Sequence, residues 1–177
     1  WIVSDCNYLQ GKITYTATDG STKTINKTYT QVIMEAGKKF DVSPYHLASR
    51  IRQEQGAGNA TETATGNGKG TYNKGYTGYY NYYNINATGG NTATIIKNAL
   101  EKAKKEGWTD PEKAIVGGAE FVKNEYIGYG QNTLYLQKFD VDDSDGDLYW
   151  HQYMTNVSAS KTEGQETRSA YSEMGKL

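Results

Sequence analysis

Apolar residues recur along much of this chain with the period of a helix that buries one face. In residues 28–40, for example, Val32, Ile33 and Ala36 fall on one side, as expected of a helix packed against a core. The helices predicted in this way cover about residues 28–40, 43–54, 92–106, 110–126, 133–138 and 159–174.

The second of these helices carries an acid on its apolar face. Ser43 can cap its start, and Pro44 suits the first helical position. Leu47, Ile51 and Glu54 follow at spacings of four and three residues, which places all three on the face that turns to the core. Burial there would raise the pKa of the Glu54 carboxyl. Alternatively, the carboxylate simply emerges at the helix end and is solvated.

Two segments lack helical periodicity. Residues 13–18 alternate in a β-like pattern before an Asp-Gly pair, which predicts a short hairpin or an extended arm. We therefore assign residues 1–27 to an N-terminal arm ahead of a single domain at 28–177. Residues 55–91 are rich in Gly, Asn, Thr and Tyr. A stretch of this length is either disordered or functional, and its aromatic content favours an ordered, functional segment. We expect short strands here that line one wall of a cleft.

The composition excludes several classes of function. With 19 Lys and Arg against 20 Asp and Glu, the 177-residue chain carries a formal net charge of −1, so no broad cationic surface for nucleic acid or anionic lipid is expected. No apolar run is long enough to span a bilayer. Cys6 is the single cysteine, which excludes an internal disulfide and a cysteine metal cluster. The start at Trp1 leads us to expect a piece processed from a longer protein, with no signal peptide of its own.

Tyrosine is unusually frequent, with 16 Tyr against 3 Phe and 3 Trp. A tyrosine ring can stack on a sugar ring while its hydroxyl bonds to the sugar, although polar, tyrosine-rich loops also suit contacts with proteins. The composition therefore leans only slightly towards carbohydrate. The tyrosines in polar surroundings include Tyr72, Tyr76, Tyr79, Tyr80, Tyr82 and Tyr83.

Metal, nucleophile and nucleotide chemistry find little support in the sequence. The acidic loop at 140–147 does not have the spacing of a calcium-binding EF-hand, and a solvated turn is favoured. His46 and His151 do not define a zinc site, and structural roles are favoured for both. No Gly-x-Ser-x-Gly elbow and no phosphate-binding loop is present. Carboxylate chemistry is left, with Glu54 as the candidate acid and Glu62 as a second carboxylate from the central segment.

Four long blocks of the sequence are distinctive in their order and content. They are residues 47–54, 78–87, 107–119 and 130–139, the last continuing into 150–156. Together these blocks resemble the bacterial N-acetylglucosaminidases of glycoside hydrolase family 73. The resemblance is greatest to the cell-wall autolysins of Gram-positive bacteria, clostridial ones in particular, and it covers roughly residues 28–175.

This resemblance implies an α+β, lysozyme-like fold in which a mainly helical lobe and a small β-lobe flank a substrate cleft. It implies a peptidoglycan hydrolase that cleaves the β-1,4 bond between N-acetylglucosamine and N-acetylmuramic acid by general acid catalysis. No metal or organic cofactor is expected, because acid catalysis and stabilisation of an oxocarbenium ion suffice. The implied location is secreted, at the bacterial cell wall. We expect a monomer as an isolated domain, fused to wall-binding repeats in the full protein.

The resemblance also implies roles for individual residues. Glu54 matches the general acid, and Asn84 begins a segment that lines the cleft floor. Tyr135 and Lys138 match a Tyr-x-x-Lys signature, and we expect Tyr126 or Tyr135 near Glu54. The predicted catalytic residues are Glu54, Glu62, Tyr126 and Tyr135, and the predicted substrate-binding residues are Tyr79, Tyr80, Tyr82, Tyr83, Asn84, Ile85 and Gln131.

The second carboxylate departs from the family pattern. Residues 84–92 contain no acid, and Glu62 is the only candidate in the expected β-lobe. Glu62 could activate water on the opposite face of the sugar, with the two carboxyl groups about 6.5–9.5 Å apart. Alternatively, the substrate's own acetamido oxygen attacks the anomeric carbon and only Glu54 is needed, with Tyr126 or Tyr135 steadying the intermediate. A glycine-rich loop that closes on substrate fits the first route, and we expect a role for Glu62.

Two rival functions are compatible with the same residues. A muramidase or lytic transglycosylase would use this fold on the other glycosidic bond. A non-catalytic glycan-binding module would use the tyrosines as a platform, although Glu54 within an intact motif weighs against it. For the favoured function, the expected partner is the glycan strand of peptidoglycan, with no nucleic acid and no membrane.

Overall fold

A computed structural model describes residues 3–142, 148–153 and 157–173. Its helices agree with those predicted from the sequence, with ends that differ by about one residue. In chain order, the elements are η1 (Asn7–Leu9), β1 (Lys12–Thr16), β2 (Thr22–Thr28), α1 (Tyr29–Phe40), α2 (Pro44–Gln55), α3 (Thr92–Glu106), α4 (Pro111–Glu125), η2 (Ile127–Tyr129), α5 (Leu134–Phe139) and α6 (Ala159–Glu173).

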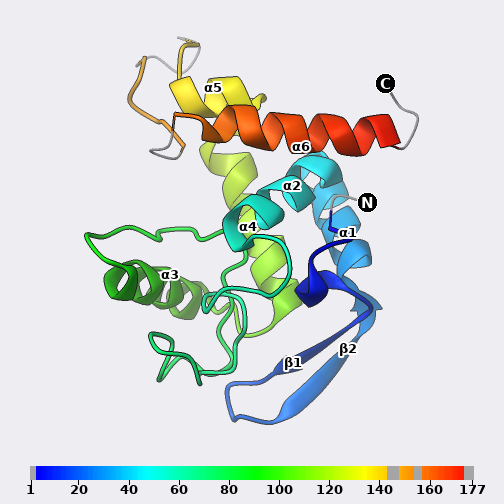
Figure 1. The fold of residues 1–177 in the computed structure, drawn as a ribbon, viewed down its shortest axis with the longest axis vertical. Helices are drawn as coiled ribbons and strands as arrows, with labels where there is room; N and C mark the ends of the chain where they lie inside the picture. Colours follow the sequence, from blue (N-terminus) through cyan, green and yellow to red (C-terminus); the bar gives the residue numbers. More distant parts are fainter. Residues whose placement is uncertain (1–2, 143–147, 154–156, 174–177) are drawn as a thin grey trace.

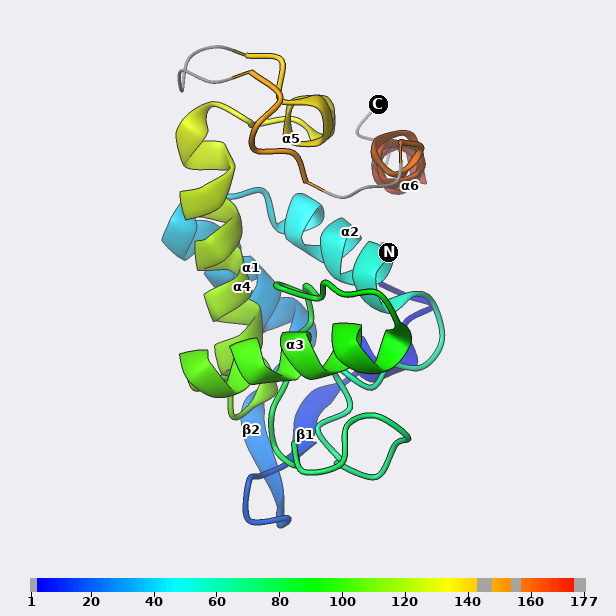
Figure 2. The ribbon, with the colours of Figure 1, turned by 90° about the vertical axis from the view of Figure 1, so that its left-hand side faces the viewer.

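Helices form the body of the molecule (Figure 1). α1, α2 and α4 lie together in its middle, and α3 lies beside them with the long segment that connects it to α2. α6 lies across the end of the molecule that also holds α5, and it packs on α2 (Figure 2). β1 and β2 form a hairpin at the opposite end. The arrangement is therefore α+β, with a small sheet attached to a helical body.

The hairpin predicted near the N-terminus is present. β1 and β2 pair antiparallel, and Asp19-Gly20 lies in the turn between them, with Gly20 at a φ of 81° that favours glycine. The segment is not a detached arm, because Cys6, Leu9 and Ile13 are buried in the core. The described part of residues 1–27 thus packs as part of the body.

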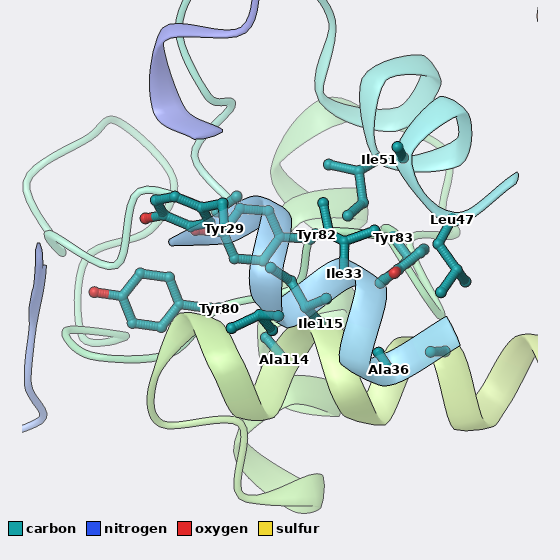
Figure 3. Packing of buried hydrophobic residues seen from close by; sticks show 14 of the residues in the cluster. Tyr29, Ile33, Ala36, Leu47, Ile51, Tyr80, Tyr82, Tyr83, Ala114 and Ile115 are labelled. Carbon is teal, nitrogen blue, oxygen red and sulfur yellow. The ribbon is translucent and has the colours of Figure 1, made fainter. Parts of the chain in front are cut away.

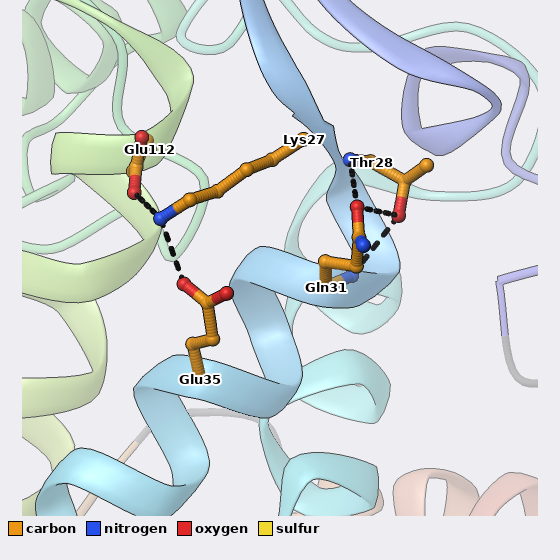
Figure 4. A network of polar contacts seen from close by, with 5 residues as sticks. All are labelled: Lys27, Thr28, Gln31, Glu35 and Glu112. Carbon is orange, nitrogen blue, oxygen red and sulfur yellow. Dashed lines mark hydrogen bonds and ion pairs between the residues drawn. The ribbon is translucent and has the colours of Figure 1, made fainter.

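Polar contacts fix the junction between β2 and α1 (Figure 4). The Thr28 hydroxyl accepts a hydrogen bond from the Gln31 amide at 3.1 Å, and the Gln31 side chain accepts from the Thr28 amide at 2.8 Å, which is a capping box. One residue earlier, the Lys27 ammonium lies 2.8 Å from Glu35 on α1 and 2.6 Å from Glu112 on α4. The end of the hairpin is thereby tied to two helices.

The core lies where α1, α2 and α4 meet tyrosines of the segment between α2 and α3 (Figure 3). Leu47 and Ile51, predicted to face the core from α2, are fully buried. The rings of Tyr80 and Tyr82 are nearly parallel, with centroids 6.4 Å apart. The residues labelled in Figure 3 are Tyr29, Ile33, Ala36, Leu47, Ile51, Tyr80, Tyr82, Tyr83, Ala114 and Ile115.

Residues 55–91 contain no strand, contrary to the expectation of short strands along a cleft wall. They form turns in which side chains bond to the backbone. Asn81 is fully buried and binds both backbone groups of Ile85 at 2.9–3.0 Å. Glu62 accepts from three successive backbone amides at 71–73. Such bonds offer the backbone an alternative to a sheet ladder, so the segment is ordered without strands.

Parts of two expectations lie outside the described residues: positions 143–147 of the acidic loop, and position 174 at the end of the predicted last helix. Within the described part of the chain, no group of three or more His, Cys, Asp and Glu side chains is arranged to hold a metal ion. The described helices are also too short or too polar to cross a membrane.

Two glycines let aromatic rings approach the backbone of α4. A Cβ at Gly118 would lie 2.0 Å from the Tyr83 ring, and one at Gly117 would lie 2.2 Å from Trp108 Nε1. Both rings are buried. The two glycines therefore determine how closely the segments that carry Tyr83 and Trp108 pack on α4.

We expect Gly118→Ala to lower the free energy of unfolding by about 1–3 kcal/mol, because the added methyl overpacks a site beside a buried ring. Gly90→Ala is the matched control, since a Cβ there meets nothing within 4 Å, and its effect should stay within about 0.5 kcal/mol. Urea unfolding of the two variants measures the difference. Equal effects would show that α4 does not depend on this close approach.

Candidate active site

Glu54 lies at the last turn of α2, one residue before the helix ends at Gln55. Gly56 follows with a φ of 79°, a conformation that suits glycine and ends the helix. The backbone carbonyl of Glu54 accepts a hydrogen bond from Asn84 Nδ2 at 2.8 Å. This bond joins the end of α2 to the segment predicted as the cleft floor.

Glu54 lines a cavity of about 850 Å³. Helices α2 to α5 and three connecting segments contribute to its lining, but β1 and β2 do not. The wall expected from a β-lobe is instead formed by residues 83–88. Glu54 supplies the only carboxyl group among the described residues of the lining. These residues are Gln53, Glu54, Tyr83, Asn84, Ile85, Asn86, Ala87, Thr88, Ile95, Phe121, Tyr126, Lys138, Gln152 and Tyr153.

The Glu54 carboxyl is paired with a phenol. The Tyr153 hydroxyl donates a hydrogen bond to Glu54 Oε1. Burial raises the pKa of Glu54, while the bond from Tyr153 and the charge of Arg50 oppose that rise without cancelling it. Glu54 therefore keeps its proton to a higher pH than an ordinary glutamic acid. A carboxyl that donates a proton near neutral pH needs such a shift.

Arg50 lies one helical turn before Glu54 and contacts the ring of Tyr153. Its guanidinium carbon is 3.6 Å from the ring centroid, a cation–π contact. Arg50 is 1% exposed, and its Nε lies 3.5 Å from Oε1 of Glu163 on α6. The Glu163 side chain is fully buried. Arg50 also donates to the side-chain oxygen of Gln137 on α5. One buried cation thus joins α2, α5, α6 and the segment that carries Tyr153.

Tyr126 is one of the two tyrosines expected near the acid, and it lines the cavity. Its ring stacks on His151 with centroids 4.8 Å apart, and it meets the Tyr153 ring edge-on at 5.4 Å. Burial raises the pKa of the Tyr126 hydroxyl, so this phenol is neutral at physiological pH. Tyr126 braces Tyr153 in the cavity wall, and its catalytic role stays a prediction.

Tyr83, Asn84 and Ile85 lie in the cavity lining, as expected of a cleft floor. Asn84 has a φ of 48°, a left-handed value that Asn tolerates better than most residues. Its Oδ1 accepts from the Thr63 hydroxyl at 2.7 Å, while its Nδ2 bonds to the Glu54 carbonyl. Contact of these residues with substrate stays a prediction.

Gln131 supports the loop before Tyr153, and it does not line the cavity. It is 1% exposed, and its Nε2 donates to Asp140 Oδ1 at 2.8 Å and to the His151 carbonyl at 2.9 Å. Asp140 in turn accepts from the His151 amide at 2.7 Å. The structure therefore gives Gln131 a structural position in place of the predicted substrate contact, because its amide is used to hold the backbone.

Glu62, the predicted second catalytic carboxylate, is also absent from the lining. Its two oxygens accept from the amides of Thr71, Tyr72 and Asn73 at 3.0, 2.7 and 2.9 Å. An added Cβ at Gly70 would lie 2.5 Å from the Glu62 carboxyl. The carboxylate thus uses both oxygens to close a loop, and the structure does not bring it to the cavity of the candidate acid.

Tyr79, Tyr80 and Tyr82 do not form the predicted sugar platform. Tyr80 and Tyr82 are each 2% exposed in the core, and they line a separate cavity of about 540 Å³ beside the hairpin. Tyr79 packs against the core and is absent from the lining of both cavities. The Tyr80 hydroxyl donates to the Thr16 carbonyl of β1 at 2.8 Å. A tyrosine ring can fill a core when its hydroxyl finds such a partner, and this accounts for the position of Tyr80 in the core.

Tyr135 does not line the cavity either. It is 59% exposed, and its ring contacts Phe139 one turn later in α5, with centroids 4.9 Å apart. Tyr126 takes the place in the cavity that was expected for one of these two tyrosines, and Tyr153 makes the hydrogen bond to the acid. Lys138, from the same signature as Tyr135, does line the cavity.

The sequence pattern does not single out three residues of the site: Arg50, Tyr153 and Glu163. Arg50 and Tyr153 lie within the blocks 47–54 and 150–156, so a signal was present in the resemblance. Nothing in the pattern indicated that the two side chains meet. Glu163 lies in a polar helix with no such signal, and only the packing of α6 on α2 brings it to Arg50.

Comparison with known proteins relates this geometry to bacterial autolysins. The chain is 30% identical over 146 residues to a bifunctional autolysin of Staphylococcus epidermidis, a match that covers 81% of the chain and 10% of the relative. It is 29% identical over 147 residues to a bifunctional autolysin of Staphylococcus aureus, a match that covers 81% of the chain and 11% of the relative. The chain is homologous to the staphylococcal autolysins. It spans about a tenth of the length of these curated relatives. No protein-family model matches the chain.

Solved structures agree with this relationship. The crystal structure of S. aureus autolysin E matches with a TM-score of 0.63 and 28% identity, covering 82% of this chain and 59% of that one. A second structure of autolysin E is a catalytic mutant in which a glutamate is replaced by alanine and the disaccharide NAG-NAM is bound. It matches with the same TM-score and identity, covering 82% of this chain and 60% of that one. S. aureus glucosaminidase B matches with a TM-score of 0.55 and 29% identity, covering 81% of this chain and 53% of that one. The predicted α+β, lysozyme-like fold is confirmed.

We expect Tyr153→Phe to raise the pKa of Glu54 further, because the variant removes a donor that stabilises the carboxylate. The wild-type carboxyl should itself titrate above the ordinary value of 4.5. Carbon-13 NMR titration of the glutamate side chains, with Glu54→Gln to assign the signal, measures both. Tyr126→Phe is the control and should shift the titration less. A Glu54 pKa that is unchanged or lowered in Tyr153→Phe would contradict this account.

We expect Arg50→Met and Glu163→Met each to lower the free energy of unfolding by about 3–5 kcal/mol, because each leaves an uncompensated charge in the interior. The double variant should lose clearly less than the sum of the two. Chemical unfolding of the four proteins gives the coupling free energy. Strictly additive losses would show that the two charges do not depend on each other.

Proposed function

We propose that this chain is a peptidoglycan hydrolase, an endo-β-N-acetylglucosaminidase that cleaves the β-1,4 bond between N-acetylglucosamine and N-acetylmuramic acid. The observation that carries the proposal is the desolvated Glu54, bonded to Tyr153 in a large cavity, in a chain homologous to staphylococcal autolysins. The related autolysin E has been crystallised with NAG-NAM, and glucosaminidase B carries the activity in its name. We place the protein at the bacterial cell wall, and within glycoside hydrolase family 73.

In the proposed reaction, Glu54 is the general acid. Its proton passes to the glycosidic oxygen as the bond from that oxygen to the anomeric carbon breaks. The carboxylate that remains is stabilised by the Tyr153 hydroxyl and by the nearby charge of Arg50. In the second half of the reaction, this carboxylate takes a proton from the attacking water. The same group thus serves as acid and then as base.

For the nucleophile, we propose the substrate's own acetamido group. Its carbonyl oxygen bonds to the anomeric carbon as the leaving oxygen departs, which gives a cyclic oxazolinium ion that water then opens. The placement of Glu62 supports this route over a two-carboxylate mechanism, because its oxygens are used by loop amides and Glu54 is the only described carboxyl of the cavity. The neutral phenol of Tyr126 is available to bond the acetamido group or the ion.

Two rival functions are less well supported. A muramidase or lytic transglycosylase would cleave the other bond, whereas a structural relative is named a glucosaminidase. A glycan-binding module would have no use for a carboxyl whose pKa burial raises beside a phenol. Attachment to wall-binding repeats and a monomeric state stay predictions.

We expect Glu54→Gln to lower the rate of glycan cleavage by about 100-fold to 10,000-fold, the usual worth of a general acid. Glu62→Gln is the control and should stay within a few-fold of wild type, provided its unfolding curve shows an intact fold. Turbidity clearing of purified peptidoglycan gives the rates. Mass spectrometry after borohydride reduction should find reduced N-acetylglucosamine at the new ends. Reduced muramic acid at those ends would contradict the proposed bond specificity. Equal losses of cleavage rate in Glu54→Gln and Glu62→Gln would favour the two-carboxylate mechanism.

A further inference from the structure

Lys138 is a nearly buried cation in the wall of the Glu54 cavity. It lies on α5, is 5% exposed and lines the cavity. Lysine is among the residues that are almost never buried without a partner. Its position therefore calls for an explanation.

No partner for this charge is found in the part of the chain that the structure describes. Lys138 does not belong to any ion pair there. Its described contact is with the Phe139 ring, whose centroid lies 5.4 Å from the ammonium nitrogen. The ammonium nitrogen is also not among the fully enclosed polar atoms that lack a hydrogen bond. It therefore keeps some contact with solvent, and Lys138 belongs to the lining of the cavity.

The backbone around Lys138 is held firmly. The Thr133 hydroxyl caps α5 by accepting from the Leu136 amide at 3.1 Å. Next to Lys138, Gln137 is 1% exposed, donates to the Gln131 carbonyl at 2.8 Å and accepts from the Arg50 guanidinium. A cation on so fixed a helix is preorganised, which favours binding of an anion because little side-chain freedom is left to lose.

We propose that Lys138 binds a carboxylate of the glycan strand and so selects muramic acid-containing strands, an inference that rests on the proposed function. N-acetylglucosamine carries no carboxylate. Muramic acid carries one on its lactyl arm where no stem peptide is attached. Where a stem peptide is attached, its amide bond uses that carboxyl, and the peptide brings carboxylates of its own. A carboxylate from either source supplies the opposite charge that the cavity lacks around Lys138, and a charge-assisted hydrogen bond from ammonium to carboxylate is strong in a site shielded from water.

A role for Lys138 as a fixed counter-ion of the acid fits the structure less well. Glu54 and Lys138 line the same cavity, but no ion pair between them is found. The hydrogen bond to the Glu54 carboxyl comes from Tyr153, and the charge that acts on its pKa is that of Arg50. Lys138 is thus left available for a group that enters the cavity.

The test compares three forms of one glycan strand. The first carries stem peptides. The second is stripped of peptides by an amidase, so that its lactyl carboxylates are free, and in the third those free carboxylates are converted to methylamides. Calorimetry measures their binding to Glu54→Gln, which prevents turnover, and to the same protein with Lys138→Met or Lys138→Arg. We expect Glu54→Gln to bind at least one carboxylate-bearing form about tenfold more tightly than the methylamide form. This ratio should fall to about one with Lys138→Met and be partly kept with Lys138→Arg.

The control is Lys104→Met in the same background, because Lys104 is exposed on α3 and outside the cavity lining; it should keep the ratio. Preference for the stripped form identifies the lactyl carboxylate as the ligand, and preference for the peptide-bearing form identifies the peptide. The proposal is overturned if Glu54→Gln does not distinguish the methylamide form, or if Lys138→Met keeps the discrimination. Because binding is measured without turnover, failure of the wild type to cleave any strand would count against the proposed function alone.

Discussion

The buried guanidinium of Arg50 is the constraint on which the geometry around Glu54 depends. A cation removed from water costs several kcal/mol unless its surroundings compensate it. Here the compensation comes from Glu163 on α6, Gln137 on α5 and the ring of Tyr153. Because these groups belong to separate parts of the chain, satisfying one charge draws α5, α6 and the segment that carries Tyr153 onto α2. The Tyr153 hydroxyl is thereby placed on the acid.

Opposing effects act on the Glu54 carboxyl. Burial raises its pKa, whereas the Tyr153 hydroxyl and the Arg50 charge stabilise the ionised form. A carboxyl that was only buried would hold its proton well but would leave a costly anion after giving it up. The combination suits a group that must first donate a proton and then accept one. The loop that carries Tyr153 is held for this purpose by Asp140 and Gln131, which are both buried.

Much of the fold could be predicted from the sequence because its determinants are local. Helical periodicity and caps such as Thr28 act within a few residues, so the helices and the hairpin turn were found close to their true ends. The partial burial of Glu54 follows in the same way. Once Leu47 and Ile51 define the inner face of α2, helix geometry carries a residue three positions later to that face.

The tertiary structure alone decided which groups meet Glu54. Tyr153 lies 99 residues from Glu54 in the sequence, and no periodicity links the two. The same holds for the tyrosines of residues 79–83, because a tyrosine ring suits a core and a sugar site equally well, and its environment depends on how 55–91 is folded. The sequence predicts Glu62 as a second carboxylate in a glycine-rich loop, but its oxygens accept hydrogen bonds from the amides of residues 71–73. Neighbours along the chain are enough to specify the helices and to place one acid on the inner face of α2. The partners of that acid depend on contacts between distant segments, and only the packed chain decides them.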